Sequence, residues 1–200
     1  MSYPPIVIST CTKYLDILEP TLSRLVSIIS HQEIDIEIHL IADFDDLPNT
    51  FKELKKYIKE IHSFKSKDWN FVINKAVEKL IELDYENIIL LLDDFWINSI
   101  DFRKLKFYCD LHKQYKLDYL RLKPDKLNPL YSRSVKAPKL KNKIPLSYQL
   151  NPDYPYPCSL QAAIWDLNYL KNKSICADSI WKFERQSGSP YSYIAKVPPI

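Results

Sequence analysis

Two adjacent carboxylates, Asp93 and Asp94, end the most apolar stretch of the sequence, "NIILLLDDFWI". An aliphatic run of this kind is typical of a strand that is buried on both faces of a sheet. Two carboxylates at its end are costly unless they are solvated, paired or bound to a cation. Mg²⁺ and Mn²⁺ prefer oxygen ligands and often share them with substrate phosphates. The pair therefore predicts either a divalent-metal site or a simple cap for the turn that follows.

The chain contains a single glycine, Gly188, which limits how it can bind a phosphate group. Neither a G-x-G-x-x-G loop nor a P-loop can be built without several glycines. A bound nucleotide would then need positive charge from another source. A divalent cation at Asp93 and Asp94 would provide it and would neutralise a diphosphate by charge instead of by backbone amides.

Charge and composition argue against several classes of protein. The net charge is +3, from 28 basic and 25 acidic residues without a basic stripe, so we expect no nucleic-acid partner. The four histidines show no ligand spacing and are predicted to be structural or solvated. The sequence shows no signal peptide and no apolar run of about 20 residues, which predicts a cytoplasmic protein. The cysteines form no C-x-x-C pair and are predicted to be free thiols; they are Cys11, Cys109, Cys158 and Cys176.

Strand-like and helix-like patterns alternate along the first part of the chain. Apolar or alternating runs predict strands, and apolar residues three and four positions apart predict helices. The alternation predicts an α/β fold: a three-layer α/β/α sandwich with a mainly parallel central sheet. The expected strands are Pro5 to Thr10, Ile34 to Asp43, Ile88 to Leu92 and Leu117 to Leu122. The expected helices begin at Glu19, cover 51–61, cover 69–81 with Asp68 as the N-cap, and cover 102–114.

The last third of the chain differs in character. Residues 123–158 hold seven of the 14 prolines and many tyrosines, and they show little periodicity. We expect a long irregular excursion with a hairpin at "PLSYQL", and long loops of this kind are often functional. Two short helices are expected after it, one over 159–172 and one from Asp178.

A mainly parallel sheet also predicts where a ligand would bind. Ligands of such sheets lie outside the carboxyl ends of the strands. Thr10, Asp43 and the pair Asp93-Asp94 each follow an expected strand. The topology therefore predicts that these residues meet at one edge of the sheet.

Four stretches of the sequence resemble the GT-A fold nucleotide-sugar glycosyltransferases, particularly bacterial enzymes of lipopolysaccharide and capsule assembly. The resemblance covers most of the chain and implies a single domain over 1–200. Within it, 1–122 would bind the nucleotide-sugar and 123–200 would bind the acceptor and hold the catalytic base. The stretches are "VISTCTKY", "DWNFVINKAVEKL", "IILLLDDFWI", and the pair "SLQAAIWDLNYL" with "SIWKFE".

By this resemblance, Thr10 and Asp43 hold the nucleotide of the donor. The acidic stretch of the family binds the metal ion, Mn²⁺ or Mg²⁺, and the diphosphate. The usual Asp-x-Asp is not met here, because Leu92 and Phe95 flank the two aspartates. Either Asp94 carries the metal with Asp93 on the ribose, or the site depends little on metal.

Glu184 is the candidate catalytic base, since an inverting transfer needs a carboxylate to take the proton of the acceptor hydroxyl. Its alternative role is that of a glutamate favoured by the dipole near a helix N-terminus. Gln161, Trp165 and Asp166 are candidates for contact with the acceptor. For Trp165, a place in the core is an equal alternative.

The resulting hypothesis is a glycosyltransferase that moves a sugar from a nucleoside-diphosphate sugar to a glycan or lipid-linked acceptor. It would work in the cytoplasm, with peripheral contact at the inner face of the membrane. Two alternatives stay open. One is a non-catalytic sugar-nucleotide or glycan-binding domain of the same fold. The other is a nucleotidyltransferase, although that class usually carries a Gly-rich, basic first loop, which "STCTKY" is not.

Overall fold

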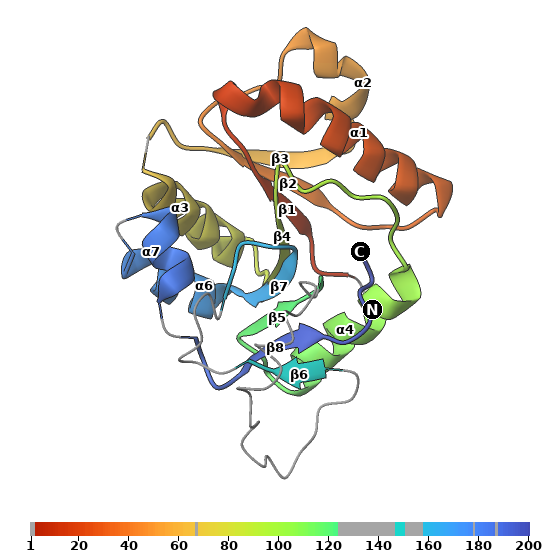
Figure 1. The fold of residues 1–200 in the computed structure, drawn as a ribbon. Coiled ribbons are helices and arrows are strands. Elements are labelled where there is room, and N and C mark those ends of the chain that lie inside the picture. The colour runs from red at the N-terminus through yellow and green to blue at the C-terminus, as the bar shows by residue number, and fades with distance from the viewer. Residues whose placement is uncertain (1–2, 67, 124–146, 151–157, 178, 187) are drawn as a thin grey trace.

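A computed structural model describes residues 3–66, 68–123, 147–150, 158–177, 179–186 and 188–200, which form one sheet with helices on both faces (Figure 1). Within these residues the sheet has the strand order β3-β2-β1-β4-β7-β5-β8-β6. The strands are β1 (Ile6–Ser9), β2 (Ile38–Ala42), β3 (Ile58–Ser63), β4 (Asn87–Leu92), β5 (Tyr119–Arg121), β6 (Ser147–Gln149), β7 (Ala163–Asp166) and β8 (Ser192–Ala195). The helices are α1 (Leu15–His31), α2 (Lys52–Lys55), α3 (Trp69–Glu82), α4 (Phe102–Gln114), α6 (Leu167–Ile175) and α7 (Ile180–Arg185).

The four strands β3, β2, β1 and β4 are parallel, and of these the sequence predicted β1, β2 and β4. β1 lies at their centre, where Ile8 pairs with Leu40 of β2 and with Leu91 of β4. Beyond β4 the sheet becomes mixed, because β7 runs antiparallel to both β4 and β5. The prediction of an α/β fold with a mainly parallel sheet in a three-layer sandwich is confirmed.

Alternate side chains of each central strand enter two separate cores. Ile6 and Ile8 of β1 pack on one face of the sheet, where α1 and α4 lie, and Val7 packs on the other. That second face is covered by α3, α6 and α7, as Figure 1 shows. A strand with helices on both sides must be apolar at every position, which explains the run Ile88 to Leu91. No helix in the part of the chain that the structure describes is long and apolar enough to cross a membrane.

The helix expected over 51–61 is wrong. Only α2, a single turn, and the short 3-10 turn η2 (Asn49–Phe51) are helical, and Ile58 begins the edge strand β3. Ile58 and Ile61 are three positions apart, a spacing that is typical of a helix. In the sheet, the pairing of β3 with β2 shifts by one residue, because Ile38 pairs with Ile58 and the next residue, His39, pairs with Glu60. This irregularity allows the three-residue spacing within a strand. An edge strand is half exposed, so its pattern carries no clear period of two.

The helix expected over 159–172 is only half correct. Its first part is β7, a four-residue strand in the middle of the sheet, and only the second part is helical, as α6. A short apolar run cannot be assigned to strand or helix by periodicity alone. The strand β8 was also missed. β6, which lies in the stretch "PLSYQL", pairs antiparallel with β8. Residues 124–146 and 151–157 of the expected excursion lie outside the described residues.

The first expected helix is longer than predicted. α1 begins at Leu15, after the 3-10 turn η1 (Thr12–Tyr14), and Pro20 lies inside it. The expected cap of α3 is confirmed, because the Asp68 carboxylate accepts hydrogen bonds from the backbone N–H groups of Asn70 and Phe71. α7 begins after Ser179, whose hydroxyl accepts from the backbone N–H of Lys182. This cap fixes the start of the helix that carries Glu184.

The buried histidine of α4 gives the first testable prediction. Burial lowers the pKa of His112 to about 3, whereas the unfolded chain has a histidine pKa of about 6.5. Below a pH of about 6.5, the unfolded state binds more protons at this histidine than the folded state does. The free energy of unfolding therefore decreases as the pH is lowered, by up to about 1.4 kcal/mol per pH unit. His112→Gln cannot take this proton.

We therefore expect the variant to lose less free energy of unfolding than the wild type between about pH 6 and about pH 4. Urea unfolding at several pH values measures this difference. His39 and His62 are unchanged in the variant, so their own contributions cancel in the comparison. Equal slopes in the two proteins would contradict the assignment.

Candidate active site

The residues that follow β1, β2 and β4 meet at the carboxyl edge of the parallel strands. Backbone hydrogen bonds continue the sheet beyond the strand ends: the Thr10 N–H donates to the carbonyl of Ile41 at 2.9 Å, and the Asp93 N–H donates to that of Ser9 at 3.2 Å. Parallel strands must end on the same side, so Asp43, which directly follows β2, lies at this edge too. The structure thus brings together Thr10, Asp43, Asp93 and Asp94.

Asp43 ties the loop after β1 to the end of β2. Its Oδ1 accepts hydrogen bonds from the backbone N–H of Thr12 at 2.6 Å and from the Thr12 hydroxyl at 2.8 Å. These bonds fix the start of the 3-10 turn η1, directly after Thr10. Through these two bonds to Thr12, Asp43 fixes the conformation of the loop that borders the site.

Asp93 is the buried member of the acidic pair, and Asp94 is exposed. Burial raises the pKa of the Asp93 carboxyl, the nearby Thr10 hydroxyl opposes this shift, and the charge of Asp94 adds to it. Although the two groups are close, neither Asp93 Oδ2 nor Thr10 Oγ1 has a partner at hydrogen-bond geometry within the described residues. Two unpaired buried oxygens side by side are unusual unless a ligand, water or ion satisfies them.

Two basic side chains reach the same edge, and sequence reasoning missed both. β5 runs parallel to β8 and antiparallel to β7, so its end points the same way as that of β4. Arg121 is buried at this end, and its Nε donates to the hydroxyl of Tyr119 at 3.2 Å. The Lys123 ammonium lies 5.1 Å from the ring centre of Phe95, just after the acidic pair. Arg121, a charged residue between the apolar residues Leu120 and Leu122 of an expected strand, was the signal that could have been followed.

Glu184 is held near this edge by a direct contact with the chain before β7. Its Oε1 accepts a hydrogen bond from the backbone N–H of Leu160 at 2.8 Å. The preceding residue, Phe183, is fully buried and meets the ring of Trp69 at 5.3 Å edge to face. The indole N–H of Trp69 in turn donates to the hydroxyl of Ser9 at 3.2 Å. This sequence of contacts positions the base candidate relative to the end of β1.

The structure separates the three acceptor candidates. Gln161 is exposed just before β7, and because β7 is antiparallel to β4, its beginning lies at the carboxyl edge. Trp165 is fully buried beside Tyr119 and does not reach the surface. Asp166 pairs with Asn87, the first residue of β4, and caps α6, so it lies at the opposite edge of the sheet.

Comparisons with known proteins give matches of structure only. No protein-family model matches the sequence, and no curated protein matches it. Among solved structures, the chain is similar to residues 1-349 of TarS from S. aureus, with a TM-score of 0.53 and 14% identity over 98% of this chain. The same protein in complex with UDP-GlcNAc gives a TM-score of 0.52 at 14% identity. A cytidylyltransferase from Leptospira borgpetersenii gives 0.50 at 14% identity over 92% of this chain and 68% of its own.

These similarities show the fold. The chain has a GT-A-like α/β architecture, as the sequence resemblance implied, at identities that leave its activity open. It spans 60% of the TarS fragment and 37% of the full TarS chain.

The buried acid of the site gives the second prediction. Because burial raises the folded pKa of Asp93 above the unfolded value of about 3.9, the folded state binds more protons in the interval between the two values. Stability contributed by this group is therefore lost as the pH rises through that interval. Asp93→Asn removes the charge and should therefore stabilise the protein without nucleotide at pH 7.

Urea unfolding at pH 7 and at about pH 4 tests this prediction. The gain should shrink at the lower pH, because the wild-type carboxyl is then increasingly protonated. A variant that is less stable than the wild type at pH 7 would show that the carboxylate has a stabilising partner. The same change at exposed Asp110 serves as the control and should alter stability little.

Proposed function

We propose that this chain is a glycosyltransferase domain that moves a sugar from a nucleoside-diphosphate sugar to a glycan or lipid-linked acceptor, with inversion at the anomeric carbon. The observation that carries the proposal is the meeting of Thr10, Asp93 and Asp94 at one sheet edge, with two buried oxygens left without partners. The fold similarity to TarS supports it. The complex of TarS with UDP-GlcNAc makes a UDP-sugar the first donor to test.

The donor would lie across the carboxyl ends of β1, β2 and β4. Thr10 Oγ1 and Asp93 Oδ2 would take hydrogen bonds from the hydroxyl groups of the ribose, which can satisfy both. Asp43 would contact the nucleotide beside the Thr12 loop that it orders. Arg121 and Lys123 would supply positive charge for the diphosphate, in place of a glycine-rich loop.

Asp94 is the residue that would hold a divalent cation. Its exposed carboxylate supplies the oxygen ligand that Mn²⁺ and Mg²⁺ prefer, and neighbouring Asp93 adds a second negative charge. Such an ion, when bound, would stabilise the charge that develops on the leaving diphosphate. One exposed carboxylate makes a weak site without a substrate phosphate, so metal and nucleotide should bind together.

Glu184 would act as the base. As the acceptor oxygen attacks the anomeric carbon, its proton passes to the Glu184 carboxylate, the bond from the anomeric carbon to the diphosphate oxygen breaks, and the diphosphate leaves with the electron pair. The hydrogen bond from the Leu160 N–H holds Oε1 and orients the carboxylate. Gln161 lies two residues before β7 on the same side and would face the acceptor.

A second candidate function has one observation in its favour. The similarity to a cytidylyltransferase supports nucleotidyl transfer, in which a nucleoside triphosphate is the substrate. The sequence has no Gly-rich first loop for a triphosphate, so we rank it second. Binding of CTP in preference to UDP or a UDP-sugar would reverse that order. A non-catalytic binder of the same fold would bind nucleotide without any transfer.

The metal role of Asp94 gives the third prediction. UDP should bind the wild type in the presence of Mn²⁺, and Asp94→Asn should weaken binding by about 10- to 100-fold, because the nucleotide and the ion depend on each other. Isothermal titration of UDP with Mn²⁺ present measures this. Asp110→Asn, on the exposed side of α4, should bind UDP like the wild type. Equal affinity in Asp94→Asn and the wild type would remove Asp94 from the metal site.

The role of Glu184 gives the fourth prediction. Glu184→Gln keeps the shape of the side chain and can still accept from the Leu160 N–H through its amide oxygen, but it cannot take a proton. Donor affinity should persist, and transfer should fall by about 10²- to 10⁴-fold. Single-turnover transfer at saturating donor, together with a donor titration and a melting curve, measures the three quantities.

Glu53→Gln is the control for this experiment, since Glu53 is exposed on α2 and pairs with Lys56. It should leave transfer unchanged. A Glu184→Gln protein with normal turnover and normal donor binding would show that another group accepts the proton.

A further inference from the structure

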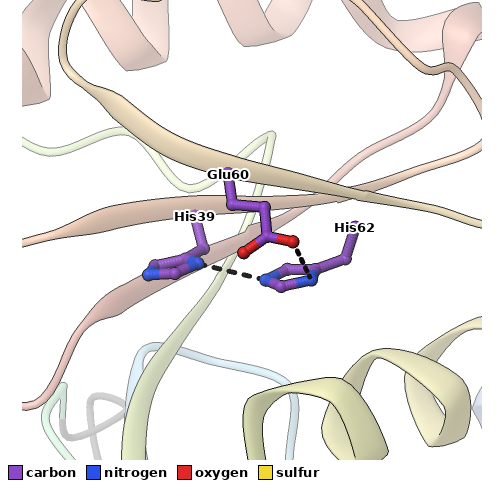
Figure 2. Close-up of side chains that lie close together, drawn as sticks. All are labelled: His39, Glu60 and His62. Atoms are coloured by element: carbon purple, nitrogen blue, oxygen red, sulfur yellow. Dashed lines mark hydrogen bonds and ion pairs between the residues drawn. The ribbon is translucent and has the colours of Figure 1, made fainter. Parts of the chain in front are cut away.

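A buried pair of histidines lies between the strands β2 and β3, away from the residues assigned above. His39 and His62 are both almost fully buried, and their nearest nitrogens, His39 Nδ1 and His62 Nε2, are 3.0 Å apart. The two ring planes differ by only 5°, and Figure 2 shows the rings meeting end to end. No spacing in the sequence revealed the pair, because its members are 23 positions apart and meet only through the pairing of β2 with β3.

Each outer nitrogen of the pair faces an acceptor group. His39 Nε2 lies 3.3 Å from the Tyr85 hydroxyl and 4.0 Å from a Glu37 carboxylate oxygen. The Tyr85 hydroxyl donates to Glu37, so its oxygen is left to accept from His39. On the other side, His62 Nδ1 lies 3.8 Å from a carboxylate oxygen of Glu60. Of the two outer nitrogens, only His39 Nε2 has an acceptor within hydrogen-bond distance, so that nitrogen favours an N–H.

Two neutral imidazoles can satisfy this arrangement with one hydrogen bond between them. If the N–H of His62 Nε2 donates to His39 Nδ1, the N–H of His39 Nε2 still faces the Tyr85 hydroxyl, and only His62 Nδ1 is left without a proton. That nitrogen lies 3.8 Å from Glu60, too far for a hydrogen bond. The same two inner nitrogens can instead bind a cation when both present lone pairs and both N–H groups are on the outer side.

Imidazole binds a metal ion in its neutral form, through the lone pair of the ring nitrogen that carries no proton.

We propose that His39 Nδ1, His62 Nε2 and the carboxylate of Glu60 bind a zinc-class transition-metal ion that fastens the edge strand β3 to β2. The ligand atoms of the three residues lie within 4.8 Å of one another. Zn–N bonds of about 2.0 to 2.1 Å in tetrahedral geometry put two nitrogens about 3.3 Å apart, close to the 3.0 Å between the inner nitrogens. Because the rings face each other end to end, they must also tilt so that both lone pairs point at the ion. Glu60 is about half exposed and on the same face of β3 as His62, so its carboxylate can turn towards the ion.

The groups around the pair fit this role. A histidine that binds a metal usually donates its other N–H to an oxygen, which fixes its orientation and its tautomer. Tyr85, held by Glu37, provides that acceptor for His39. Imidazole nitrogens favour zinc over Mg²⁺, which prefers oxygen, so this site differs in chemistry from Asp94.

Direct titration of the untagged, chelator-treated protein tests the proposal. We expect one Zn²⁺ to bind per chain, and Co²⁺ to bind at the same site with the intense visible absorption of tetrahedral coordination. His39→Asn and His62→Asn should each weaken Zn²⁺ binding by at least about 100-fold, and Tyr85→Phe by about 10- to 100-fold. Added Mg²⁺ should not compete.

Two matched variants keep the result decisive. His31→Asn removes an exposed histidine at the end of α1 and should leave binding unchanged. Glu60→Gln alters only an exposed side chain of β3, so it should fold normally and still weaken binding by about 10-fold or more. Asp94→Asn should bind Zn²⁺ like the wild type, which separates this site from the proposed active site.

Melting curves with and without Zn²⁺ give the second readout. Zn²⁺ should raise the Tm of the wild type and of His31→Asn, but much less that of Glu60→Gln. A wild type that binds no Zn²⁺, or folded Glu60→Gln and Tyr85→Phe proteins with wild-type affinity, would overturn the proposal.

Discussion

The parallel alignment of β2, β1 and β4 between two layers of helices is the constraint on which the rest of the structure depends. Strands covered on both faces cannot carry charged side chains along their length without a large desolvation cost. Polar groups therefore concentrate where the strands stop. Because parallel strands stop on the same side, Thr10, Asp43 and Asp93 arrive at one edge as a consequence of burial and direction.

The antiparallel strand β7 brings a second group of residues, those just before it in the chain, to the carboxyl edge of the parallel strands. It enters the sheet beside β4 in the opposite direction, so the chain just before it lies at the carboxyl edge, and the chain just after it lies at the other. Leu160 and Gln161 are therefore placed with the acidic pair, and Asp166 is placed away from it. The bond from the Leu160 N–H to Glu184 then attaches α7 to the same edge. Trp165, between the two edges, is left to pack in the core against Phe183.

Buried polar groups mark both of the sites proposed for this chain. At the carboxyl edge, Thr10 Oγ1 and Asp93 Oδ2 have no hydrogen-bond partner within the described residues, which costs stability unless something else binds. Between β2 and β3, the facing nitrogens of His39 and His62 are bonded to each other, and a metal ion at this position would replace that bond. A hydroxyl-rich ligand suits the first site, and a cation suits the second, because oxygen and imidazole differ in what they bind best.

The sequence by itself determined the α/β class, the central strands and the edge at which Thr10, Asp43, Asp93 and Asp94 meet. These features follow from local patterns and from the direction of the strands, which a run such as "NIILLLDD" displays in full. It did not determine β3, β7 or β8, because a four-residue or half-exposed strand has too little pattern and is defined by its neighbours. Only the tertiary structure decided that Trp165 is in the core, that Arg121 and Lys123 reach the acidic edge, and that His39 meets His62. Each of these depends on which strand pairs with which, and residues far apart in the chain carry no spacing signal for such a contact.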